Sequence, residues 1–150
     1  MLLNETFTQE NLQSILADRS FDIVHVATHA AFRQGNPQSS YIEFFDETLN
    51  FKQFSQLPWR PLQTELLILS ACQTALGDRQ AELGFAGLAL QSGIKSAIAS
   101  VWDVSDTGTL ALMAEFYQQL PLVNTKAQAL QQAQITMLNH QVSFANNELK

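Results

Sequence analysis

Continuous apolar runs alternate along the chain with segments in which apolar residues recur every three or four positions. The continuous runs are Phe21–Thr28, Glu65–Ala71 and Ser96–Trp102. Runs of this kind are typical of strands that are buried on both faces. Two shorter segments, Tyr41–Phe45 and Leu49–Phe51, flank an Asp-Glu-Thr turn and predict a small antiparallel hairpin.

Helical spacing predicts four helices. The first covers about residues 8–18, with Thr6 or Thr8 at its start, and the second closes at Gly93 after Phe85, Leu88, Ala89 and Ser92. The third begins at Ser105 or Asp106, ends at Pro121 and turns inward Leu110, Met113, Ala114 and Tyr117. The last places on one face Ala127, Leu130, Ala133, Met137 and Leu138. Together with the strands, this order predicts an α/β fold, a mainly parallel sheet flanked by helices.

Composition narrows the picture to one domain over residues 1–150, since 46% of the residues are apolar. A net charge of −6 disfavours nucleic acid and anionic membranes as partners, and no apolar run approaches the roughly 20 residues that span a bilayer. The single Cys excludes an intramolecular disulfide, and no CxxC pair is present for a structural zinc. We therefore expect a cytoplasmic protein without a metal or an organic cofactor.

Chemistry is expected where the parallel strands end, because functional groups gather at that edge of an open α/β sheet. His29 follows the first apolar run and Cys72 follows the second. A thiol beside an imidazole is the pairing that nucleophilic catalysis requires. The alternative for Cys72 is a small buried apolar residue. His25 lies inside the first run and is interpreted as a structural group.

Asp103 and Asp106 follow the third run at the same predicted edge. They are interpreted either as a loop residue and a helix cap or as groups that line a substrate pocket. No glycine-rich phosphate-binding motif follows any of the strands, so nothing in the sequence favours nucleotide binding.

Four segments carry a resemblance to a known family: HVATHAAF (25–32), LLILSACQTALGD (66–78), ELGFAGLALQSGIKSAIASVWDVSD (82–106) and KAQALQQAQITML (126–138). They resemble the CHAT family, bacterial caspase-like domains that are often attached to tetratricopeptide repeats. The resemblance implies a three-layer caspase-like fold and a peptidase that cleaves protein or peptide substrates. In that reading His29 is the catalytic base and Cys72 the nucleophile. Their separation of 43 residues is compatible with the roughly 50 of caspases.

The resemblance also implies an oxyanion hole made by the backbone amides of Ala30 and Cys72. Many family members have Gly at the position of Ala30, and Ala narrows the backbone geometry that is allowed there. The strand that carries the His begins about twenty residues from Met1, so the resemblance covers the C-terminal half of a complete domain and the N-terminal strands are missing. The first apolar run is then an exposed sheet edge, which we expect a partner chain or a second copy to cover.

Two functions thus remain open. The first is a caspase-like cysteine endopeptidase that uses a Cys–His dyad, in which Asp103 or Asp106 would favour a basic residue before the scissile bond. The second is a catalytically inactive, caspase-like interaction module that works by pairing with another protein. Thiol labelling and the oligomeric state distinguish the two.

Overall fold

The computed structural model describes residues 1–33, 36–59, 63–71, 84–139, 144–145 and 148–149. The chain divides into two compact units, Met1–Asp103 and Val104–Lys150. The first contains the main sheet and the predicted His29, and the second is mostly helical. Each unit is described by itself below.

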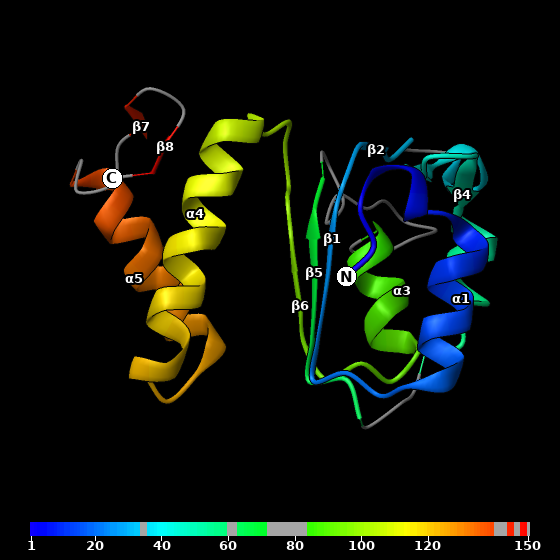
Figure 1. Ribbon diagram of the computed structural model, residues 1–150, viewed down its shortest axis with the longest axis horizontal. Coiled ribbons are helices and arrows are strands. Elements are labelled where there is room, and N and C mark those ends of the chain that lie inside the picture. Colours follow the sequence, from blue (N-terminus) through cyan, green and yellow to red (C-terminus); the bar gives the residue numbers. More distant parts are fainter. Residues whose placement is uncertain (34–35, 60–62, 72–83, 140–143, 146–147, 150) are drawn as a thin grey trace. The chain divides into compact units, whose positions relative to one another are not determined.

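The first unit is built on a parallel sheet of three strands in the order β1-β5-β6. These strands are β1 (Ile23–Ala27), β5 (Leu66–Ser70) and β6 (Ala97–Ala99). Helices α1 (Gln9–Asp18) and α3 (Gly84–Gln91) lie on the same face of this sheet (Figure 1). The predicted α/β class, with a parallel sheet flanked by helices, is confirmed.

Local signals set the ends of both helices as the sequence predicts. The hydroxyl of Thr8 caps α1 by accepting a hydrogen bond from the amide of Asn11 (3.2 Å). Gly93 follows α3 with φ at 89°, a left-handed conformation that a residue with a Cβ adopts only at a cost. The next amide, Ile94, then donates to the carbonyl of Ala89 (3.2 Å), which closes the helix in a Schellman arrangement.

A small antiparallel sheet extends from the end of β1 in the order β2-β3-β4. It consists of β2 (Ala30–Ala31), β3 (Tyr41–Glu43) and β4 (Thr48–Asn50). The last two strands are the predicted hairpin. Two short 3-10 turns accompany the first unit: η1 (Asn4–Thr6) and η2 (Pro37–Ser39).

Helix α2 (Phe51–Ser55) was not predicted, because its first residue was assigned to the end of the hairpin strand. The side chain of Asn50 accepts from the amide of Gln53, and the side chain of Gln53 accepts from the amide of Asn50, both at 2.9 Å. This reciprocal capping box turns the chain into a helix directly after β4.

The core of the first unit fills the space between the sheet, the two helices and the hairpin. Aromatic rings form its centre: Phe85 of α3 packs edge-on against both Phe51 and Phe54 of α2, with ring centroids 5.4 Å apart in each pair. The indole N–H of buried Trp59 donates to the carbonyl of Phe54 (3.1 Å). The other buried members of this core are Leu12, Leu16, Val26, Ile42, Phe44, Leu49, Leu57, Leu67, Leu69, Ala89 and Ile94.

Burial of the strands differs from the expectation at the two edges of the main sheet. Central β5 is buried on both faces, as predicted, from Leu66 to Leu69. Edge strand β1 buries Val26 but leaves His25 and Ala27 exposed, so the prediction that this run is buried on both faces is wrong. In the third run only β6 is a strand, and its residues are half-buried, while Trp102 is 69% exposed. An edge strand has one neighbour and is correspondingly less covered.

The second unit contains α4 (Asp106–Gln119), the 3-10 turn η3 (Leu120–Leu122), α5 (Lys126–Leu138) and two short paired strands, β7 (Phe144–Ala145) and β8 (Glu148–Leu149). Helices α4 and α5 pack against each other. As predicted, Ser105 caps α4, by accepting from the amide of Gly108 (3.1 Å).

The predicted inward faces of these two helices are only partly correct. Met113 is buried, but α4 buries Ala111 and Phe116 with it, and the predicted Leu110 and Tyr117 are exposed. The predicted face of α5 is buried at Ala133 and half-buried at Leu130 and Met137, and it is exposed at Ala127 and Leu138. Apolar residues occupy adjacent stripes on both helices, so spacing alone did not identify the buried stripe.

Candidate functional site

The ends of β1 and β5 lie side by side. The register pairs Ala27 with Ser70 as the last partners of the two strands. The amide of Thr28 donates to the carbonyl of Ser70 (3.3 Å), so Thr28 is also bonded to β5. Ala71, which follows β5, is buried. The residues that directly precede the two predicted dyad residues are therefore neighbours at the carboxyl edge of the sheet.

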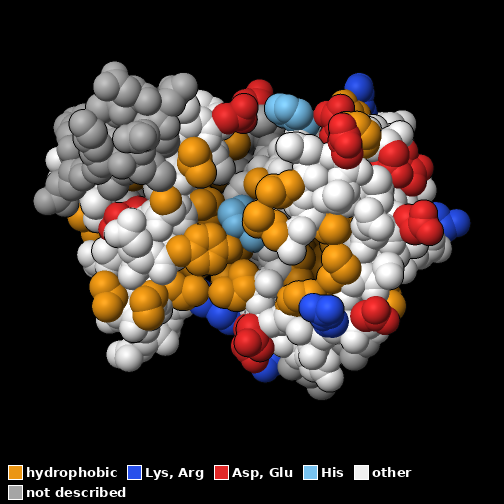
Figure 2. All heavy atoms as spheres, in the orientation of Figure 1, with side chains coloured by type: hydrophobic (Ala, Val, Ile, Leu, Met, Phe, Trp, Pro, Cys, Tyr) orange, Lys and Arg blue, Asp and Glu red, His pale blue; other side chains and the backbone are white. Residues whose placement is uncertain are grey.

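His29 leaves this edge with an exposed side chain and a fixed backbone. Its carbonyl accepts from the amide of Glu43 in β3 (2.8 Å), and the hydroxyl of Thr28 donates to the carbonyl of Glu43 (2.8 Å). Both histidines that the structure describes reach the surface, and Figure 2 shows pale blue histidine side chains there. A solvent-accessible imidazole on a fixed backbone can exchange protons with a bound substrate.

The amide of Ala30 faces away from β3. Antiparallel pairs alternate between hydrogen-bonded and non-hydrogen-bonded positions. The bond from Glu43 to His29 makes that pair a hydrogen-bonded one, so the next pair, Ala30 with Ile42, is non-hydrogen-bonded. The ladder with β3 thus leaves the Ala30 N–H directed to the other side of β2, where it can serve an acceptor that is not part of this sheet.

Cys72, the predicted nucleophile, lies outside the described residues, as does the rest of the segment from 72 to 83. In the sequence it directly follows Ala71, the buried residue at the end of β5. His29 and Cys72 are therefore each two residues beyond the last register pair of their strands, Ala27 with Ser70.

His25 makes a cross-strand contact on the sheet face opposite α1 and α3. Its Nε2 atom lies 2.8 Å from the hydroxyl of Ser70, a hydrogen bond between β1 and β5. Although His25 reaches the surface, partial burial of its ring lowers its pKa from the ordinary value of 6.5. The structural interpretation of His25 is consistent with this contact. Ser70 was not singled out in the sequence, although a polar residue that ends an apolar run on the face of His25 was the available signal.

Asp103 and Asp106 occupy different units. Asp103 is the last residue of the first unit and is exposed, after the end of β6. Asp106 is the first residue of α4 and is also exposed. A carboxylate in the first turn of a helix interacts favourably with the helix dipole, so Asp106 has a structural role whether or not it meets a substrate.

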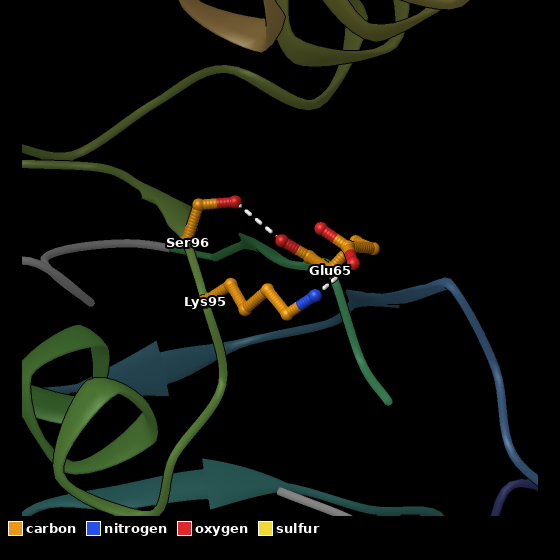
Figure 3. A network of polar contacts seen from close by, with 3 residues as sticks. All are labelled: Glu65, Lys95 and Ser96. Atoms are coloured by element: carbon orange, nitrogen blue, oxygen red, sulfur yellow. Dashed lines mark hydrogen bonds and ion pairs between the residues drawn. The ribbon is translucent and has the colours of Figure 1, made fainter. Parts of the chain in front are cut away.

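A polar network joins β5 and β6 at the opposite, amino-terminal end of the sheet (Figure 3). The ammonium of Lys95 pairs with the carboxylate of Glu65, and the hydroxyl of Ser96 donates to the carbonyl of Glu65 (2.5 Å). The amide of Leu67 then donates to the carbonyl of Ser96 (3.0 Å). These contacts hold the two strands in register from the end that carries none of the predicted site residues.

No group of three or more His, Cys, Asp or Glu side chains in the described part of the chain is arranged to hold a metal ion. None of its helices has the length and apolar character needed to cross a membrane.

Comparison with known proteins identifies the family. A search of curated protein sequences gave no significant match. A family model, that of the CHAT domain, matches residues 1–146, nearly the whole chain. The four segments that resemble this family lie within that match, and the parallel sheet with its flanking helices agrees with a caspase-like arrangement. The chain therefore belongs to the CHAT domain family of caspase-like, peptidase-related domains.

Proposed function

We propose that this CHAT domain is a cysteine endopeptidase in which Cys72 is the nucleophile and His29 is the general base and acid. The observation that carries the proposal is the pairing of the two strand ends, through the Thr28 amide and the Ser70 carbonyl. Neighbouring strands lie about 4.8 Å apart, so residues that follow paired strand ends start within reach of each other.

The reaction needs four proton transfers and passes through a thioester intermediate. The imidazole of His29 takes the proton of the Cys72 thiol, and the thiolate attacks the carbonyl carbon of the scissile peptide. The tetrahedral oxyanion collapses as the imidazolium gives its proton to the leaving amine, which leaves a thioester on Cys72. Water, deprotonated by the same imidazole, then attacks the thioester and releases the carboxylic acid and the thiol.

The amide of Ala30 supports the second part of the proposal, an oxyanion hole made with the amide of Cys72. In the β2–β3 ladder, Ala30 is in a non-hydrogen-bonded pair, so its N–H is not used by β3. A backbone amide directed at the developing oxyanion is the usual donor in acyl transfer, and loss of one such donor costs about 10²–10³ in kcat.

A thiol-reactive peptide tests the dyad cleanly, because Cys72 is the single Cys of the chain. We expect a peptide that carries an electrophilic ketone to label the wild type at neutral pH and to leave Cys72→Ala unlabelled. His29→Ala should lose labelling at pH 7 and recover it near pH 9, where a thiol of ordinary pKa about 8.5 ionises without a base.

The control for His29→Ala is His140→Ala, which removes another histidine of the same chain and should label like the wild type. Equal labelling of His29→Ala and the wild type at neutral pH would contradict the dyad. Because thiols persist in reducing compartments, we place the activity in the cytoplasm and take its substrates to be proteins or peptides.

A second function is favoured by the outer edge of β1. Among the described strands, β1 pairs with β5 alone. The Asp22 carbonyl and the Thr28 amide both bond to β5, so the alternate positions Ile23 and Ala27 direct their main-chain groups outward. An unpaired edge accepts another strand. We infer that, if the dyad is inactive, the chain works by pairing this edge with a second copy.

Light scattering after size-exclusion chromatography tests the edge. Antiparallel pairing about His25 would place Ile23 opposite Ala27 of the second copy, with no charged side chains opposed. Ala27→Pro removes an outward N–H and spares the bond from Thr28 to β5, so it should convert a dimer to a monomer. A dimer that persists in Ala27→Pro would contradict pairing through this edge, and a dimer without thiol reactivity would favour this function over the peptidase.

A further inference from the structure

We propose that Thr28 is a positioning residue for His29 and the Ala30 amide, acting through the main chain of Glu43. This inference rests on the proposed peptidase function, since it assigns a residue that prepares the same site. It is carried by two hydrogen bonds of 2.8 Å, from the Thr28 hydroxyl to the Glu43 carbonyl and from the Glu43 amide to the His29 carbonyl.

These bonds make Thr28 a bridge between the two sheets. Its amide donates to Ser70 of β5 (3.3 Å), and its hydroxyl donates to Glu43 of β3 (2.8 Å). The chain passes from the parallel to the antiparallel sheet at this residue. Thr28 is half-buried, and a β-branched apolar residue would fill the same space. The space could thus be filled by an apolar side chain, and the hydroxyl of Thr28 adds a specific hydrogen bond to Glu43.

The main chain of Glu43 forms hydrogen bonds with two consecutive residues, Thr28 and His29. Its carbonyl accepts from the hydroxyl of Thr28, and its amide donates to the carbonyl of His29. Both main-chain groups of Glu43 therefore hold the segment between β1 and β2. The side chain of Glu43 is exposed and takes no part in either bond. Beyond His29, the pairing of Ala30 with Ile42 continues the same ladder. The orientation of the Ala30 amide thus depends on the hydrogen bonds of Glu43 at the start of this ladder.

Loss of the hydroxyl would loosen the start of the ladder without removing any proposed reacting group. A displacement of about 1 Å between reacting groups can cost about 100-fold in rate. We expect Thr28→Val to label at least about tenfold more slowly than the wild type with the ketone peptide. Thr28→Ser keeps the donor and should recover most of the rate.

Two measurements, with Thr136→Val as the control, separate positioning from a general loss of structure. Thr136→Val removes a similar hydroxyl bond, to the carbonyl of Gln132 in α5 (2.9 Å), and should label like the wild type. The pH profile of alkylation by iodoacetamide should shift upward in Thr28→Val and not in Thr136→Val, because a displaced His29 no longer promotes ionisation of Cys72.

The outcomes are distinguishable from those of the proposed function. A folded Thr28→Val that matches the wild type in both rate and pH profile overturns the positioning role. Should Thr28→Val not fold, Thr28→Ala takes its place, and unfolding of both overturns the proposal because the hydroxyl would then serve the fold. If the wild type is not labelled, the proposed peptidase function is wrong. In that case, hydrogen exchange of the Glu43 amide tests the positioning role of Thr28. If this amide exchanges no faster in Thr28→Val than in Thr136→Val, the positioning role is overturned.

Discussion

The ring of His25 and the hydroxyl of Ser70 are joined across β1 and β5, with Nε2 and Oγ 2.8 Å apart. In the register His25 pairs with Ile68, and Ser70 pairs with Ala27, so the bond runs diagonally toward the carboxyl edge of the sheet. It connects the middle of the strand that leads to His29 with the last residue of the strand that leads to Cys72.

Partial burial of the same ring predicts that acid destabilises the protein through His25. Burial lowers the pKa of His25 in the folded state below the 6.5 of the unfolded chain, so the unfolded state binds more protons as the pH falls. The contribution of His25 to stability is therefore constant above about pH 7 and declines below about pH 6.5. Urea unfolding at pH 7.5 and at pH 5.5 measures the decline.

The variant His25→Gln isolates this effect from the titration of carboxylates, which acts on both proteins. Gln cannot gain a proton, so the urea midpoint of His25→Gln should fall less between pH 7.5 and pH 5.5 than the urea midpoint of the wild type. An equal fall in the two proteins would show that His25 does not contribute to the acid sensitivity.

Asp103 and Asp106 predict that the proposed peptidase prefers a basic residue before the scissile bond. If either carboxylate faces the bound side chain, charge complementarity should raise kcat/KM for Lys and Arg over uncharged residues by about tenfold. Asp103→Asn and Asp106→Asn, made separately, identify which carboxylate acts. Asp46→Asn, an exposed change in the hairpin turn, is the control. A cleavage profile of a peptide library without basic preference would end this assignment.

The cap of α4 predicts that Gly108 responds unusually to substitution by Ala. A Cβ added to Gly108 would lie 2.7 Å from the hydroxyl of Ser105, the atom that accepts the Gly108 amide. Gly→Ala inside a helix usually stabilises by about 1 kcal/mol, but here it displaces the cap, whose loss costs about the same. Gly108→Ala should therefore be close to neutral in the wild type and stabilising by about 1 kcal/mol in Ser105→Ala.

A double-mutant cycle on thermal or urea unfolding measures this coupling. The expected interaction between Ser105 and Gly108 is about 1 kcal/mol, a typical size for residues in contact. Additive effects of the two substitutions would mean that Ser105 keeps its hydrogen bond in the presence of the added Cβ.

The network at the amino-terminal end of the sheet predicts unequal contributions from its members. Lys95 and Glu65 are about 40% exposed, so removal of their ion pair in Lys95→Met should cost less than about 1 kcal/mol and depend on salt. Ser96→Ala removes a half-buried hydrogen bond to the Glu65 carbonyl and should cost about 1 kcal/mol at any salt concentration. Urea midpoints at low and high ionic strength check both, and a salt-dependent loss in Ser96→Ala would contradict the distinction.

Short-range signals in the sequence predicted what they encode locally. Thr8, Gly93 and Ser105 act where the sequence places them, because a cap depends only on residues within one turn. Helix α2 was missed because its capping box begins on the final residue of a strand, and strand spacing concealed it. The inward face of α4 was partly wrong, since the choice between adjacent apolar stripes is made by the packing of α5.

The candidate site divides in the same way. The positions of His29 and Cys72 after apolar runs were evident from the sequence, because strand ends and the chemistry of the two side chains are local. The sequence placed both strand ends at one edge of a parallel sheet, but the register of β1 with β5 and the bonds that join Glu43 to Thr28 and His29 were not predicted. They depend on contacts between residues distant in sequence, which the period of the apolar pattern does not encode.

The topology of the main sheet has a consequence during synthesis. β1 is completed long before β5, the one strand to which it is bonded among the described residues, and the small sheet and α2 lie between them in the sequence. At roughly 5–20 residues per second, β1 waits about 2–8 seconds for that partner. The ladder between β3 and β4 pairs residues at most nine positions apart, so this hairpin can form in the interval. Until β5 arrives, the apolar residues of β1 are available to chaperones, so the rate of elongation between these strands should affect the yield of folded protein.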